Sequence, residues 1–112
     1  MAVATVTLRP GIAGASFVTG KYVCDSSPSN TNINVGFVPS MVTVINATDK
    51  DVSLTWTADM TDGHGITDAG AAVTSGGITP VAQTDGTNHG FLIGTDAAVQ
   101  EASKTYSFIA YR

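Results

Sequence analysis

The sequence predicts an all-β protein: one domain of short antiparallel strands, arranged as a sandwich, a jelly roll or a small barrel. Three observations lead to this prediction. The chain has 112 residues, a length that suits a single domain, residues 1–112, with one hydrophobic core. Strong helix formers are scarce, with Glu101 as the one glutamate, whereas Thr, Val, Ser and Gly are abundant. Short runs that alternate apolar and polar residues recur between turn-forming clusters.

The expected strands follow one another along the chain, separated by turn residues. The first run, AVATVTL, stands at the start, so residues 1–15 could form an N-terminal arm or edge strand, or the domain's own first strand. The one helical candidate is 95–102, which Thr95 would cap, but it is short and an irregular loop fits equally well. The expected strands are 2–8, 16–24, 32–38, 41–45, 52–57, 71–74, 78–83, 90–94 and 104–111.

The segment PSMVTVINATDKDVSLTW contains two of these strands and ends at the single tryptophan of the chain. Val52, Leu54 and Trp56 fall on one face of the second strand, because side chains alternate between the two faces. Trp56 is therefore interpreted as a core residue rather than an exposed binding platform. MVTVI carries apolar residues on both faces, which is typical of a central strand. The predicted core residues are Val52, Leu54, Trp56, Phe91, Tyr106 and Phe108.

Two glycine-rich segments, 61–77 and 84–90, are expected as exposed loops, the first with a short strand inside it. They hold both histidines, His64 and His89. Asp59, Asp62, His64 and Asp68 lie close in sequence, but the loop lacks the alternating acids and final glutamate of a calcium loop. Two histidines without defined spacing are equally weak evidence for a transition metal. We therefore expect no metal and no cofactor.

Nothing in the sequence indicates an enzyme. Cys24 lies in a strand-like run, and no histidine is placed near it in sequence to activate it as a nucleophile. The acidic residues lie mostly in turns, away from the apolar surroundings that would suit acid–base catalysis. The formal net charge is −4 and the five Lys and Arg residues are scattered, which argues against binding to nucleic acid or to an anionic membrane.

Charged residues make up only 12% of the chain, about half the usual share. One interpretation is that a partner covers part of the surface. The other is a β protein kept in solution by neutral polar side chains. The composition alone fits both. The chain also lacks a secretory signal at its start and any apolar run long enough to span a membrane, so a cytoplasmic site of synthesis is expected.

The segments VGFVPSMVTVINATDKDVSLTWTADM (35–60) and TSGGITPV with HGFLIGTDAAVQEASKTYSFIAYR (74–112) carry a resemblance. They resemble small β-rich proteins of tailed bacteriophages, and capsid decoration (cement) proteins most of all. The matching positions are Gly90-Phe91, Ile93-Gly94, Asp96-Ala97 and Tyr106 to Tyr111; residues 1–30 show no such match. The motifs are patterns of turns and strands and are moderately specific.

The resemblance implies a single jelly-roll-like β-sandwich that binds the outside of the major capsid shell and clamps it across capsomer junctions. It implies a location on the virion exterior after synthesis in the host cytoplasm, and no catalytic residues. A homo-oligomer is expected, with a dimer favoured over a trimer. The alternative is a receptor- or carbohydrate-binding domain of a tail fibre or tail tip; a hydrolase or metal enzyme ranks last. The N-terminal run supplies the expected capsid-contact residues, Val3, Val6, Leu8 and Arg9.

Overall fold

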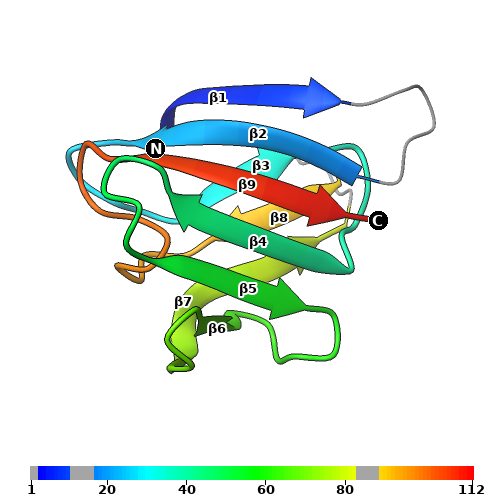
Figure 1. Cartoon of the computed structure of the whole chain (residues 1–112). Helices are drawn as coiled ribbons and strands as arrows, with labels where there is room; N and C mark the ends of the chain where they lie inside the picture. The colour runs from blue at the N-terminus through cyan, green and yellow to red at the C-terminus, as the bar shows by residue number, and fades with distance from the viewer. Residues whose placement is uncertain (1–2, 11–16, 83–88) are drawn as a thin grey trace.

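The computed structural model describes residues 3–10, 17–82 and 89–112 (Figure 1). Residues 3–10 are described by their backbone alone. The described residues form strands and turns, without a helix, so none of them belongs to a helix that could cross a membrane. The strands are β1 (Val3–Pro10), β2 (Phe17–Cys24), β3 (Thr31–Asn34), β4 (Met41–Asn46), β5 (Ser53–Thr57), β6 (His64–Thr67), β7 (Ala72–Val81), β8 (Gly90–Ile93) and β9 (Thr105–Tyr111).

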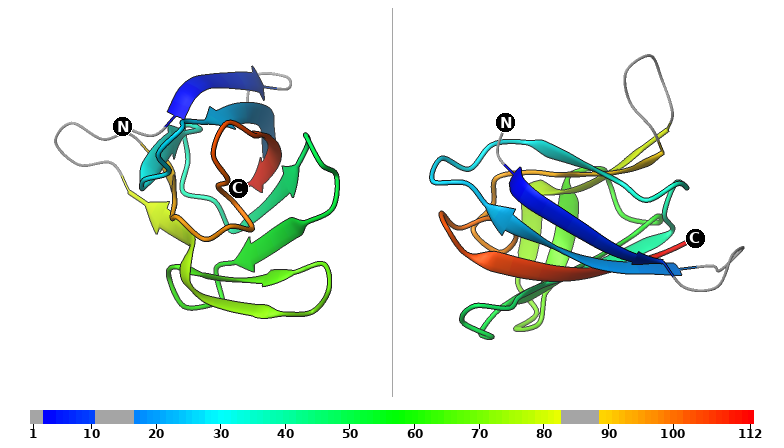
Figure 2. Two further views of the ribbon diagram at one scale, coloured as in Figure 1. Left: turned by 90° about the vertical axis from the view of Figure 1, so that its left-hand side faces the viewer. Right: turned by 90° about the horizontal axis from the view of Figure 1, so that it is seen from above.

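All nine strands join one antiparallel sheet in the order β1-β2-β9-β4-β5-β6-β7-β8-β3. The sheet curls into a half-barrel, so that β3, β8 and β7 lie behind β2, β9 and β4 (Figures 1 and 2). The prediction of an all-β antiparallel protein is confirmed. Hydrogen bonds link the described strands into one curled sheet, and this arrangement does not establish the two-layer sandwich or the jelly roll expected from the sequence.

The segment 61–77 differs from its prediction as an exposed loop with one short strand. It contains β6 and the first part of β7, and β7 runs on through Ser75-Gly76-Gly77, which the sequence suggested as a turn. A bulge lies there: Gly65 pairs with Val73, whereas the preceding His64 pairs with Ile78. Gly76 has φ +79°, and a Cβ on Gly77 would lie 2.4 Å from the His64 carbonyl oxygen. The two glycines therefore permit the sharp bend at which the sheet curls.

The segment 94–104 is a chain of turns that crosses one end of the half-barrel (Figure 2, left). The helix considered for 95–102 is absent, and Asp96 rather than Thr95 organises the first turn. The Asp96 carbonyl accepts from the Gln100 N–H at 2.9 Å, and its carboxylate accepts from the Ala98 N–H at 2.9 Å. One such turn is not continued, as expected for a run too short to hold a helix. Ala98, Val99 and Gln100 are buried against the core.

The core fills the concave side of the curled sheet. Phe91 on β8 meets Phe108 on β9 edge to face, with ring centroids 5.4 Å apart, so the two halves of the sheet touch across the core. Trp56 is 1% exposed, and its indole N–H donates to the Thr61 carbonyl at 3.3 Å. Of the residues expected in the core, the structure buries Leu54, Trp56, Phe91, Tyr106 and Phe108, and Val52 is partly buried against them.

Two buried tyrosines predict a loss of stability in alkali. Tyr22 and Tyr106 stack with centroids 5.3 Å apart, and burial raises the pKa of Tyr106 to about 12 and that of Tyr22 well above its ordinary value of 10.0. Because the folded-state pKa is raised, the stability is fully present below pH 10 and is lost as the pH rises towards 12. The free energy of unfolding, measured in urea across this range, should fall more steeply than in Tyr106→Phe. An equal fall in that variant would contradict this cause.

Candidate interaction surfaces

The Cys24 thiol is built into the core and is poorly suited to act as a nucleophile. It is 1% exposed and donates to the Gln100 side-chain oxygen at 3.2 Å. Burial raises the pKa of Cys24, and the neighbouring carboxylate of Asp25 raises it further. Reactive cysteines have a lowered pKa and access to solvent. The position of Cys24 at the end of β2 thus gives it a structural contact rather than a chemical role.

The described histidines and acids do not form a metal-binding cluster. No group of three or more His, Cys, Asp or Glu residues gathers within the described part of the chain. His64 lies in β6 and His89 directly precedes β8, and β7 separates these two strands in the sheet. Asp59, Asp62 and Asp68 are exposed at turns, where short polar side chains are common.

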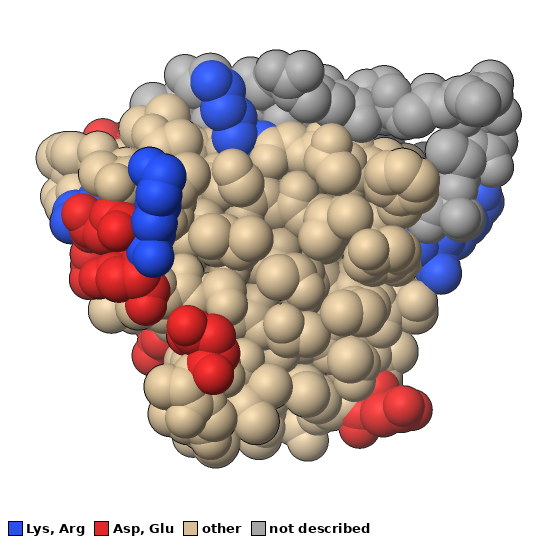
Figure 3. All heavy atoms as spheres, in the orientation of Figure 1, with Lys and Arg blue, Asp and Glu red and all other residues tan. Residues whose placement is uncertain are grey.

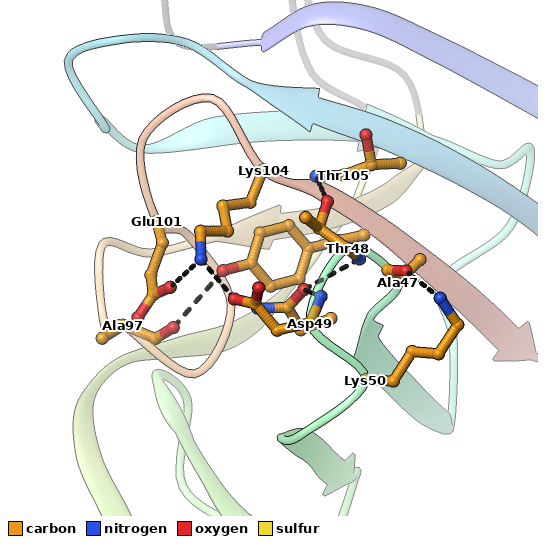
Figure 4. A network of polar contacts seen from close by, with 10 residues as sticks. Ala47, Thr48, Asp49, Lys50, Ala97, Glu101, Lys104 and Thr105 are labelled. Carbon is orange, nitrogen blue, oxygen red and sulfur yellow. Dashed lines mark hydrogen bonds and ion pairs between the residues drawn. The ribbon is translucent and has the colours of Figure 1, made fainter.

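A network of polar contacts around Lys104 connects the β4–β5 turn to β9 (Figure 4). Lys104 forms an ion pair with Asp49 and a longer one with Glu101, at 3.6 Å. The hydrogen bond from Lys104 lowers the pKa of Asp49, and the same bond raises the pKa of Lys104. The Thr105 N–H donates to the Thr48 hydroxyl at 2.8 Å, which ties the β4–β5 turn to β9. Such exposed pairs stabilise weakly.

A more informative surface is the convex side of β2, β9, β4 and β5, which we call the outer face. Strand register arranges its side chains in three rows that run across the sheet. The residues are Phe17, Tyr111, Met41 and Thr57 in the first row; Thr19, Ile109, Thr43 and Thr55 in the second, which Ile66 of β6 extends; and Lys21, Ser107, Ile45 and Ser53 in the third.

The outer face is nearly uncharged and mixes apolar residues with threonines and serines. Phe17, Tyr111, Ile45 and Ile66 are 39 to 45% exposed. Of the residues in the three rows, only Lys21 is charged. Figure 3 shows this side of the molecule: its centre carries no Lys, Arg, Asp or Glu, and charged side chains lie around the rim. Exposed apolar residues on a nearly uncharged surface with a charged rim are typical of a protein-binding site.

Two shallow depressions lie in the outer face, on either side of Ile45. The first, of about 390 Å³, lies between Lys21 and Ile45, over Ser107. The second, of about 170 Å³, lies on the β5 side and is lined by Ile45, Val52, Ser53 and three charged residues, Lys50, Asp51 and Asp68. Ile45 thus separates the two depressions. Lys21 lines the larger one, and Lys50, Asp51 and Asp68 line the smaller one.

The second candidate surface is the free edge of β1. β1 ends the strand order, and β2 is its one partner among the described strands. A shift in register between Val3 and Thr5 and the presence of Pro10 limit the regular edge to Thr5–Arg9. The positions expected to contact a capsid, Val3, Val6, Leu8 and Arg9, all lie on this strand; their side chains fall outside the described structure.

Comparisons with known proteins identify no relative. A scan against protein-family models found no matching family, and searches of curated proteins and of solved structures gave no match. The functional interpretation below therefore depends on the residues, the two surfaces and the sequence resemblance.

The outer face is not apparent from the sequence, although MVTVI carries one of its signals. Apolar residues on both sides of MVTVI predict a central strand, and β4 does lie between β9 and β5. The structure places Val42 and Val44 in the core and leaves Ile45 exposed on the other side. Apolar residues on both faces can indicate either complete burial or a binding surface, and sequence periodicity does not separate the two.

Proposed function

We propose that this chain is a non-enzymatic capsid decoration protein of a tailed bacteriophage. It binds the outside of the major capsid shell on the virion and stabilises it across capsomer junctions. The proposal includes a jelly-roll-like form of the fold, which is supported by the contact between β8 and β9 across the core. It includes no cofactor and no metal.

The observation that carries the proposal is the free edge of β1. An edge strand exposes unpaired backbone N–H and C=O groups, which can pair with a strand of another protein. The regular stretch Thr5–Arg9 spans about 17 Å at about 3.3 Å per residue, long enough for one partner strand. A clamp made of such contacts gains strength because each oligomer holds more than one capsid subunit. The sparse charge of the chain supports the same proposal.

Co-sedimentation with empty capsids of the parent phage tests this function. We expect saturable binding, with the number of bound copies equal to the number of symmetry-related sites. Deletion of residues 2–9 should abolish binding, and Arg9→Glu should weaken it without loss of the fold. Circular dichroism must show that each variant is folded. If the folded deletion variant still binds, β1 is not the contact; if the intact protein does not bind, the function is wrong.

One observation favours the alternative of a carbohydrate- or receptor-binding domain of the tail. Phe17 and Tyr111 are exposed neighbours on the outer face, with ring centroids 6.2 Å apart and tilted by 38°. Exposed aromatic rings are common in sugar sites because their flat apolar faces pack against the C–H groups of a sugar ring. The same sedimentation experiment separates the two functions: a few copies on the tails of whole virions, and none on capsids, would favour this alternative.

A further inference from the structure

We infer that the outer face is the interface of a homodimer, and that two copies meet face to face about a two-fold axis parallel to the strands. The axis runs between β9 and β4. The strand register and the charges of the face both lead to this arrangement, and neither depends on capsid binding.

The shape of the outer face fits this two-fold axis. A two-fold axis between β9 and β4 places each β9 position against the β4 position of the same row in the other copy. In the third row, Ile45 of one copy then faces Ser107 of the other. Ile45 is 45% exposed, and Ser107 is one of the residues that line the larger depression. The Ile45 side chain of each copy therefore enters the larger depression of the other copy. The two-fold symmetry produces this contact twice in the dimer.

The charges on the outer face are complementary about the same axis. Lys21 lies at the β2 side of the third row, and Ser53 ends that row at the β5 side. The axis brings Lys21 of one copy against the smaller depression of the other. Asp51 and Asp68 line that depression with Lys50, so its net charge is negative and opposite to that of Lys21. An axis perpendicular to the strands would instead place Lys21 against the first row, which holds no acid.

The area of the outer face predicts a weak dimer. Strands lie about 4.8 Å apart and rise about 3.3 Å per residue, so four strands of about seven residues span roughly 450 Å². Two such faces amount to about 900 Å², which is below the ~1,200 Å² at the lower end of specific interfaces, and the convex shape of the face reduces the area that meets. The dimer should therefore be weak, with a dissociation constant in about the micromolar range. Exposed Phe, Tyr and Ile residues would supply most of the affinity.

Sedimentation-velocity ultracentrifugation of the purified chain, without capsids, tests the interface over a range of concentrations. Wild type should shift from monomer to dimer as concentration rises. Ile45→Glu should raise the dissociation constant about tenfold or more, because it places a carboxylate in the apolar contact. Val38→Glu is the matched control: Val38 is 43% exposed, close to the 45% of Ile45, but lies between β3 and β4 and should leave the dimer unchanged. Ile45→Ser is a second variant in case Ile45→Glu fails to fold.

Charge reversal tests the axis. Lys21→Glu and Asp68→Lys should each weaken the dimer, and the double variant should recover most of the wild-type affinity. Asp62→Lys makes the same charge change at a residue that lines neither depression, and should have little effect. A wild-type chain that stays monomeric, or a dimer that persists in Ile45→Glu, would overturn the interface; a double variant no tighter than either single one would overturn the axis. Because capsids are absent, the dimer and the capsid function can fail independently.

Discussion

Trp56→Ala is expected to reduce the free energy of unfolding by about 3 to 5 kcal/mol. Trp56 is 1% exposed and stands opposite Val42 on the concave side of the sheet, so its removal leaves a large cavity. The hydrogen bond from its indole N–H to the Thr61 carbonyl is lost as well. Since small domains have only about 5 to 15 kcal/mol of stability, the variant should be close to unfolding at physiological temperature. Urea denaturation followed by circular dichroism measures the loss.

Two further variants separate the packing of Trp56 from other causes. Trp56→Phe keeps most of the apolar volume but loses the hydrogen bond, so its loss should be clearly smaller. Thr57→Ala changes the next residue, which points to the outer face, and should alter the free energy of unfolding by only about 0.5 kcal/mol. A loss well below 1 kcal/mol in Trp56→Ala would contradict a core role and would make Trp56 a candidate binding residue.

Much of the fold could be predicted from the sequence because core strands such as β5 and β9 alternate strictly. In β5 the residues Leu54 and Trp56 face inward, and in β9 Tyr106 and Phe108 do the same. Prediction failed at the bend within β7. Gly76-Gly77 resembles a turn in sequence, but in the structure the pair allows a strand to bulge and bend. Local propensity does not show whether a glycine pair ends a strand or curves it, because the difference depends on the neighbouring strands.

The candidate surfaces were less predictable than the core. A row such as Lys21, Ser107, Ile45 and Ser53 comes from four strands that are far apart in sequence, and only the register brings them together. The edge position of β1 likewise depends on the strand order, although its sequence already made it a candidate. The buried contacts of the segment 94–104 escaped prediction because a turn has no periodicity that marks its inward side.

That segment gives the second large effect: Gln100→Leu should reduce the free energy of unfolding by about 2 to 4 kcal/mol. Gln100 is 2% exposed, and its amide donates to the carbonyls of Ser29 at 2.7 Å and Gly94 at 2.8 Å, while its oxygen accepts from Cys24. Leucine has a similar volume but no polar atoms, so these backbone carbonyls lose their side-chain donor in a buried setting. Urea denaturation measures the loss of free energy. Most of this loss should come from the unpaired carbonyls, because leucine keeps the apolar contacts of the glutamine side chain.

Gln100 contributes this much stability because the half-barrel is open at this end. Ser29 lies between β2 and β3, Gly94 follows β8, and Cys24 ends β2, so Gln100 joins strands that the sheet itself does not connect by hydrogen bonds. The Tyr22 hydroxyl also holds the segment 94–104 in place by donating to the Val99 carbonyl at 2.7 Å.

Tyr22→Phe and Gln100→Leu should therefore be coupled. The double variant should lose less stability than the sum of the two single variants, because either change frees the segment 94–104. Glu101→Ala, at the adjacent exposed position, should change stability by only about 0.5 kcal/mol. Full additivity of the two buried changes would show that the segment does not act as one unit in closing this end of the sheet.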